Sequence, residues 1–206
     1  MEMIRKIMDR ISDRFQRVPS VEPSQVRMQL DPTFVTEKDL IVEFGVGKGL
    51  FIRNYAAKYP DKNFLGVEKY QKWTRHAFQR IEKNGLTNVR LMQATGEEVV
   101  TLLSSHSVRE YYILFPDPWP KRRHQQRRII QTSMIERIHF TLKTGGRLYI
   151  ATDHADYYQW MQKIIQPFLK HHFKSIQYVR PEFISNYQVK YEKEGRPIYT
   201  IHVEKI

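Results

Sequence analysis

The chain has 206 residues, enough for one sizeable hydrophobic core and few for two, so a single domain with small additions is expected. It contains no cysteine, which excludes disulfides and thiolate metal sites, and its eight histidines show no metal-ligand spacing, so no metal is expected. The formal charge of +12 favours a polyanionic partner, nucleic acid first, over a merely soluble basic surface.

The N-terminal segment MEMIRKIMDRISDRF carries charges throughout, whereas a secretory signal needs an apolar stretch there. No apolar run in the chain approaches the roughly 18 residues of a membrane span, so a cytoplasmic protein is expected. Residues 1–35 are interpreted as a basic, helical N-terminal arm, and residues 36–206 as one domain. The cations of the arm form one dense basic group: Arg5, Lys6, Arg10, Arg14 and Arg17.

Apolar runs bounded by turn residues then alternate with amphipathic stretches, which is typical of parallel strands joined by crossover helices. The predicted parallel strands are 39–44, 63–68, 88–92, 109–115 and 146–152. Two further runs, SIQYVR and PIYTIHVEKI, have no convincing helix between them and predict a closing C-terminal antiparallel hairpin. The expected fold class is therefore α/β, a doubly wound, mostly parallel, seven-stranded sheet, which binds ligands at the carboxyl ends of its strands.

The first strand runs into EFGVGKG, where Gly45, Gly47 and Gly49 predict a tight turn that lets a ligand approach the backbone. The motif is neither a GxGxxG fingerprint, because Leu50 occupies its last place, nor a phosphate loop. Glu43 ends the strand just before the glycines, where its charge would repel a pyrophosphate. A cationic or zwitterionic ligand is therefore favoured.

Glu68 closes the second strand, at the place where an acid typically accepts hydrogen bonds from both ribose hydroxyls of an adenosine ligand. With Glu43, it favours S-adenosylmethionine, which combines adenosine with a sulfonium and an amino acid end. After the third strand Thr95 stands where many adenosyl-binding sheets have an acid against the adenine amino group. The alternative is that the glycines only permit close packing and the glutamates are exposed strand ends.

The fourth strand leads into FPDPWPKRRHQQRR, in which three prolines hold Asp117 in a narrow backbone range at the mouth of the sheet. Such stiffness suits preorganised recognition, although a rigid turn with Asp117 as a helix cap is the alternative. Trp119 either stacks on a base or packs beneath the loop. The cations that follow are interpreted as phosphate contacts rather than a solvated charge run: Lys121, Arg122, Arg123, Arg127 and Arg128.

The chain resembles the tRNA (guanine-N7)-methyltransferase family, a class I, Rossmann-like methyltransferase family, over nearly its whole length after residue 38. The resemblance is strongest at FPDPWPKRRHQQRR and extends to VEFGVGKG, NFLGVEKY, GGRLYIATDHADY and GRPIY. It implies transfer of the methyl group of S-adenosylmethionine, giving S-adenosylhomocysteine, to N7 of guanosine 46 in the variable loop of tRNA. No obligate protein partner is expected, so the protein is a monomer or homodimer.

The resemblance also implies site residues. Glu43, Gly45, Gly47, Glu68, Thr95 and Asp117 are similar to cofactor-binding positions, and Asp117 also to the catalytic acid. Asp153, at the end of the fifth strand, fits substrate contact and helix capping equally. The expected substrate-binding residues are Lys121, Arg123, His124, Arg127, Asp153, Ser185, Asn186, Tyr187 and Gln188. In the last four, SNYQ departs from the family's Thr-x-x-Glu motif, but Ser185 and Gln188 can still hydrogen-bond a nucleotide.

Two other functions remain open on the sequence. An exocyclic-amine methyltransferase would carry an Asp-Pro-Pro-aromatic loop, from which DPWP differs at its third and fourth positions. A noncatalytic RNA-binding protein would not need the glycines and glutamates of the cofactor site.

Overall fold

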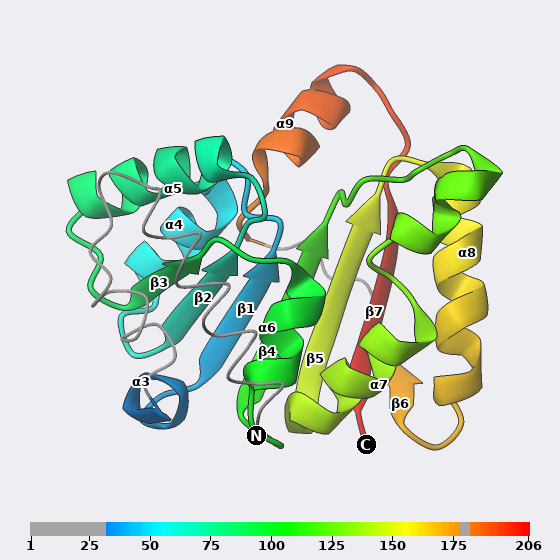
Figure 1. Ribbon diagram of the computed structural model, residues 1–206, viewed down its shortest axis with the longest axis horizontal. Coiled ribbons are helices and arrows are strands. Elements are labelled where there is room, and N and C mark those ends of the chain that lie inside the picture. The colour runs from blue at the N-terminus through cyan, green and yellow to red at the C-terminus, as the bar shows by residue number, and fades with distance from the viewer. Residues whose placement is uncertain (1–31, 178–181) are drawn as a thin grey trace.

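The computed structural model describes residues 32–177 and 182–206. These residues form a seven-stranded sheet in the order β3-β2-β1-β4-β5-β7-β6, with helices on both faces (Figure 1). The strands are β1 (Leu40–Phe44), β2 (Asn63–Val67), β3 (Val89–Met92), β4 (Val108–Leu114), β5 (Leu142–Thr152), β6 (Phe173–Ser175) and β7 (Tyr199–Lys205). The helices are α3 (Pro32–Thr36), α4 (Leu50–Lys58), α5 (Gln71–Lys83), α6 (Gly96–Leu102), α7 (Thr132–Thr141), α8 (Ala155–Ile165), α9 (Asn186–Lys193) and the 3-10 helices η1 (Arg122–Arg127) and η2 (Gln166–Phe168).

Strand direction fixes where a ligand can bind. Strands β1 to β5 run parallel to one another, whereas β7 pairs antiparallel with β5 and β6. The chain moves outward from β1 to β3 and then returns to β4 on the other side of β1, so the topological switch point lies between β1 and β4. The predicted fold class, a doubly wound, mostly parallel sheet with an antiparallel C-terminal pair, is confirmed.

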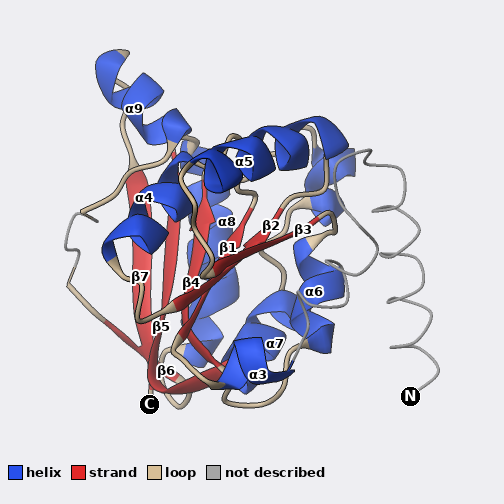
Figure 2. Cartoon of the chain, turned by 90° about the vertical axis from the view of Figure 1, so that its left-hand side faces the viewer, coloured by secondary structure: helices blue, strands red, loops and turns tan. Residues whose placement is uncertain are grey.

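The core lies on both faces of the sheet. Every residue of β1 and β2 is buried, as expected for strands with helices on either side. One apolar cluster joins the sheet to α6, α7 and α8 and includes Met134 and Met161, and the other joins it to α4 and α5 and includes Ile52 and Ala77 (Figure 2). This two-sided packing holds the carboxyl ends of β1, β2 and β4 in fixed positions.

The C-terminal region differs from the prediction in two ways. The strand expected over 175–180 is instead β6, which shares only Ser175 with that run, and residues 178–180 lie outside the described part of the chain. The expectation of no helix between the last two strands is wrong, because α9 lies there. Only Gln188 of this helix is buried, so α9 has no apolar stripe that a sequence pattern would reveal.

Residues 1–31, which contain almost all of the expected N-terminal arm, lie outside the described residues, so the division at residue 35 stays a prediction. Among the described residues, no helix has both the length and the apolar character needed to cross a bilayer.

Candidate active site

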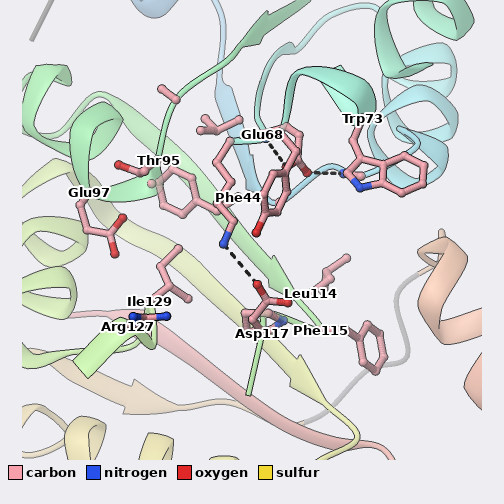
Figure 3. A pocket seen from close by; sticks show the side chains of 18 of the residues that line it. Phe44, Glu68, Trp73, Thr95, Glu97, Leu114, Phe115, Asp117, Arg127 and Ile129 are labelled. Carbon is pink, nitrogen blue, oxygen red and sulfur yellow. Dashed lines mark hydrogen bonds and ion pairs between the residues drawn. The ribbon is translucent and has the colours of Figure 1, made fainter. Parts of the chain in front are cut away.

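Two adjoining cavities, of about 290 and 350 Å³, open at the carboxyl ends of β1, β2 and β4. They share wall residues from the glycine turn, α5, β4 and α9, namely Gly45, Gly47, Trp73, Leu114 and Tyr187, so we treat them as one strand-end cavity. Figure 3 shows residues of the first part, which include Glu68, Thr95, Asp117 and Arg127. The walls of the second part include Glu43, Ser185, Asn186 and Lys190.

The glycine turn after β1 has a backbone that only glycine adopts readily. Gly47 has a φ of 51°, and its amide donates a hydrogen bond to Glu68 Oε2 at 3.0 Å. Gly49 has a φ of 72°, and a Cβ there would lie 3.0 Å from the Cβ of Ala77 on α5. The turn therefore serves both to open the cavity and to seat α4 against α5.

Glu68 lies on the cavity wall with its carboxylate held by the backbone. Besides the Gly47 amide, the amide of Tyr70 donates to Oε1 at 2.9 Å. Burial raises the pKa of Glu68, and these two amides oppose that shift. The carboxylate is thus fixed in orientation while lone pairs remain for the hydroxyls of a ligand, as its predicted role as a ribose acceptor requires.

Glu43 is only 3% exposed, and no described residue donates a hydrogen bond to its Oε2. Burial raises its pKa to about 8, the Ile52 amide opposes the shift, and the nearby charge of Glu68 adds to it. A buried acid with an unpartnered oxygen on a cavity wall is expected to favour a positively charged ligand, which lowers the cost of its ionised form.

The raised pKa of Glu43 makes the stability of the free protein depend on pH. Because the folded state keeps this proton up to about pH 8 while the unfolded state loses it near 4.5, the free energy of unfolding should fall as pH rises through this window. Urea unfolding between pH 5 and pH 8 measures the slope. The Glu43→Gln variant should have a shallower slope, and an unchanged slope would contradict the assignment.

Thr95 lies on the cavity wall and also begins α6. Its hydroxyl accepts from the Glu98 amide at 3.2 Å, and Glu98 Oε2 accepts from the Thr95 amide at 2.9 Å, which forms a capping box. The predicted adenine contact would therefore use a hydroxyl that already holds the helix. Glu97, which the sequence did not single out, is an exposed acid on the same wall, close to Thr95 (Figure 3).

Asp117 lies on the opposite wall, on the proline loop after β4. Its side chain is 57% exposed and does not point into the core. Its Oδ2 forms an ion pair with Lys69 Nζ, and the two atoms are 3.2 Å apart (Figure 3). Phe115 and Trp119, on either side of it, have positive φ values of 54° and 42°, which are uncommon for aromatic residues. The prolines and these two residues give the loop a defined, strained path.

Arg128 corrects the prediction for the basic segment. Its side chain is 2% exposed, and its Nε donates to the carbonyl oxygen of Pro118 at 2.8 Å. Its guanidinium lies over the rings of Tyr157 and Trp160, with 4.8 and 5.2 Å to the ring centroids. Arg128 therefore anchors the proline loop to α8. It is not available for phosphate contacts, because the rings of Tyr157 and Trp160 shield its guanidinium from solvent.

The Arg128→Ala variant should lose this anchor. Removal of a charge-assisted hydrogen bond and two cation–π contacts is expected to lower the free energy of unfolding by about 2–4 kcal/mol. The Arg122→Ala variant, at an exposed position on the same segment, is the control and should change stability by less than about 0.5 kcal/mol. Equal urea midpoints for the two variants would contradict the anchoring role.

The other cations of the segment remain in solvent. Lys121, Arg122, Arg123 and Arg127 are exposed on and just before η1. Arg127 also lines the cavity, and its guanidinium lies 5.1 Å from the centroid of the Trp119 ring. These four residues therefore form an exposed basic rim on the segment that follows Asp117.

His124 and Trp119 pack together, with their ring centroids 5.8 Å apart and their planes nearly perpendicular. Trp119 is half-buried and lines the cavity, so it lies at the loop surface rather than in the core. The sequence left open whether Trp119 contacts a base or packs beneath the loop. In the structure one side of its ring borders the cavity.

Asp153 is not the cap of the helix that follows it. His154 is the N-cap of α8 and accepts from the Tyr157 amide, whereas Asp153 forms an ion pair with Arg196 at 3.0 Å. Asp153 and Arg196 belong to two of the motifs that carry the family resemblance, and the ion pair ties the end of β5 to the segment before β7.

The SNYQ segment begins α9. Ser185 is the N-cap and accepts from the Gln188 amide at 3.1 Å, and Ser185, Asn186 and Tyr187 line the second part of the cavity. Gln188 does not line it, because its side chain is buried and donates to Glu192 within the helix at 3.0 Å. The structure thus brings three of the four expected residues to the cavity. Gln188 does not line the cavity, and its role in substrate binding stays a prediction.

The chain matches a family model described as "Putative methyltransferase" over residues 37–201. Curated proteins named tRNA (guanine-N(7)-)-methyltransferase are similar to it. The relative from Alkalilimnicola ehrlichii is 34% identical over 73% of this chain and 62% of its own length, and that from Nocardia farcinica is 36% identical over 72% and 54%. The chain thus spans less than two thirds of the length of these relatives.

Solved structures similar in fold include the aminoglycoside resistance methyltransferase NpmB1, with a TM-score of 0.61, 12% identity and coverage of 91% of this chain and 95% of that one. An S-adenosylmethionine-dependent O-methyltransferase from Thermotoga maritima gives a TM-score of 0.56, with 18% identity over 97% and 71%. At such identities these matches establish the fold alone. The chain belongs to the methyltransferase family matched over residues 37–201, and its resemblance to the tRNA (guanine-N7)-methyltransferases is confirmed.

Proposed function

We propose that this protein is an S-adenosylmethionine-dependent methyltransferase that methylates N7 of guanosine 46 in the variable loop of tRNA. It acts in the cytoplasm, as a monomer or homodimer, without a metal. The observation that carries the proposal is one cavity that has the adenosine-type acceptor Glu68 on one wall and Asp117 on the other, beside an exposed basic rim.

The cavity fits S-adenosylmethionine. Glu68 would accept from the ribose hydroxyls, and the unpartnered Oε2 of Glu43 suits the positive charges of the methionine end. Gly45 and Gly47 allow the ligand to approach the backbone, and Thr95 with Glu97 lies where the adenine would be held. The bound ligand supplies an electrophilic methyl group.

The role of Asp117 follows from the chemistry of guanine. N7 carries a lone pair and no proton, so its attack on a methyl group needs no general base at that atom. Asp117 is instead proposed to accept hydrogen bonds from N1–H and N2–H of guanine and to offset the positive charge that the base gains. Alignment of the reacting atoms between the two walls supplies much of the remaining acceleration.

The exposed cations of the basic rim are proposed to bind the tRNA backbone. These residues, Lys121, Arg122, Arg123 and Arg127, lie on the segment that follows Asp117. Each phosphate contact would steepen the log-log salt dependence of binding by roughly 0.7–0.9. The names of the relatives, tRNA (guanine-N(7)-)-methyltransferase, support both tRNA as the substrate and N7 of guanine as the atom that is methylated.

The proposal is tested by incubation of the protein with methyl-labelled S-adenosylmethionine and tRNA that lacks modifications, followed by digestion to nucleosides. We expect the label in 7-methylguanosine at position 46. Label on an exocyclic amine would favour the rival methyltransferase activity, and tRNA binding without transfer would favour a noncatalytic RNA-binding protein.

A further inference from the structure

Lys69 joins the two walls of the strand-end cavity. It follows Glu68 at the end of β2, lines the cavity, and reaches Asp117 on the proline loop at 3.2 Å (Figure 3). Its ammonium also lies 5.8 Å from the centroid of the Trp119 ring. An ammonium, a carboxylate and an aromatic ring, from β2 and the loop after β4, are therefore close together at one point of the cavity.

Both members of the ion pair keep unused hydrogen-bonding capacity. An ammonium has three donors and a carboxylate about four acceptor sites. The contact between Nζ and Oδ2 uses one of each, and a hydrogen bond with Tyr70 uses a second donor of Lys69, which leaves one for a ligand. Partial burial alone lowers the pKa of Lys69, but the hydrogen bond and charge of Asp117 raise it above its usual value, so the ammonium stays protonated. The pair is also 40% and 57% exposed at its two side chains, so a ligand can reach it.

The pair matches the polar edge of guanine in type and order. That edge presents an acceptor, O6, next to two donors, N1–H and N2–H, and enzymes that act on an extruded base read this edge by hydrogen bonds while an aromatic side chain stacks on the ring. Adenine presents an amino group in place of O6 and a lone pair in place of N1–H, so both contacts would become repulsive.

We propose that Lys69 is a specificity-determining residue that donates a hydrogen bond to O6 of the target guanine while Asp117 accepts from N1–H and N2–H. Trp119, whose ring lies near both Lys69 and Arg127, borders this pair. This inference rests on the proposed function and deepens it, because it names the residue that recognises one atom of the substrate base. O6 adjoins N7, so the contact also orients the atom that is methylated.

The test combines a protein change with a single-atom change in the base. The Lys69→Met variant and the wild-type protein are given tRNAs that carry guanosine, 6-thioguanosine or inosine at the target position. In 6-thioguanosine a sulfur, which is a weak acceptor, replaces O6, whereas inosine lacks only the N2 amino group. The kcat/KM of N7 methylation is measured for each pair, and calorimetry follows the affinity for S-adenosylmethionine.

For the wild-type protein, guanosine should be preferred to 6-thioguanosine by about 10- to 100-fold. The Lys69→Met variant should lose about the same factor with guanosine, no longer distinguish these two bases, and still discriminate against inosine. Its affinity for S-adenosylmethionine should stay within about twofold, because Glu68 is intact. The Lys83→Met variant, which removes an exposed charge at the end of α5, is the control and should behave as wild type.

A Lys69→Met variant that keeps the wild-type preference for guanosine over 6-thioguanosine would overturn the inference, even if its overall rate were lower. So would a loss that appears only as weaker binding of S-adenosylmethionine. Failure of the proposed function is a separate result, because the wild-type protein would then form no 7-methylguanosine in the guanosine tRNA, and both ideas would fall.

Discussion

The Asp117→Asn variant is expected to lower kcat on the order of 10²- to 10³-fold while its affinity for S-adenosylmethionine changes by less than about threefold. Asparagine would present an amino group to the N1–H and N2–H donors of guanine that Asp117 is proposed to bind, and it would remove the charge that is proposed to offset the positive methylated base. The side chain is 57% exposed, so the change should cost little stability. Single-turnover methylation of tRNA, with calorimetry of cofactor binding, measures both quantities.

A matched control is the Asp61→Asn variant, which changes an exposed aspartate between α4 and β2, at the opposite end of the sheet from the cavity. It should methylate tRNA at the wild-type rate. Equal turnover by the Asp117→Asn variant and this control would remove Asp117 from the catalytic account.

The Glu68→Gln variant should show the opposite pattern, with the main loss in cofactor affinity. The carboxylate accepts from the amides of Gly47 and Tyr70 and is proposed to accept from both ribose hydroxyls, whereas a glutamine amide must present an NH₂ group to one of these donors. We expect the affinity for S-adenosylmethionine to fall roughly 100-fold, as two charge-assisted hydrogen bonds are weakened. Calorimetry of cofactor binding measures this.

The Glu82→Gln variant, at an exposed position on α5, is the control and should bind the cofactor as the wild-type protein does. If the Glu68→Gln variant bound equally well, the ribose role would belong to another residue, and the location of the adenosine would have to be revised.

The positions of several candidate site residues are set by local order along the chain. In a parallel sheet, a residue at the end of a buried strand or just after it lies at the edge formed by the carboxyl ends of the strands. The positions of Glu43, Gly47 and Glu68 therefore followed from the periodicity of the sequence. The stiff loop that carries Asp117 followed in the same way from its prolines.

The parts that were missed depend on contacts between distant segments. Arg128 looks like its neighbours in sequence, and only the positions of Tyr157 and Trp160 on α8 show that it is an anchor. The contact between Lys69 and Asp117 joins residues 48 positions apart, and α9 has no apolar stripe. No local sequence pattern predicts contacts between residues so far apart in the chain. Lys69 directly follows Glu68, however, so its place at the end of the same strand could have been predicted.

The most direct test of the central claim exchanges the reacting atom itself. Two tRNAs are compared in single-turnover reactions, one with guanosine and one with 7-deazaguanosine at the target position, in which a CH group without a lone pair replaces N7. We expect guanosine to be converted to 7-methylguanosine, whereas the 7-deazaguanosine tRNA should bind comparably but receive no methyl group. Equal methylation of the two tRNAs would contradict the central claim.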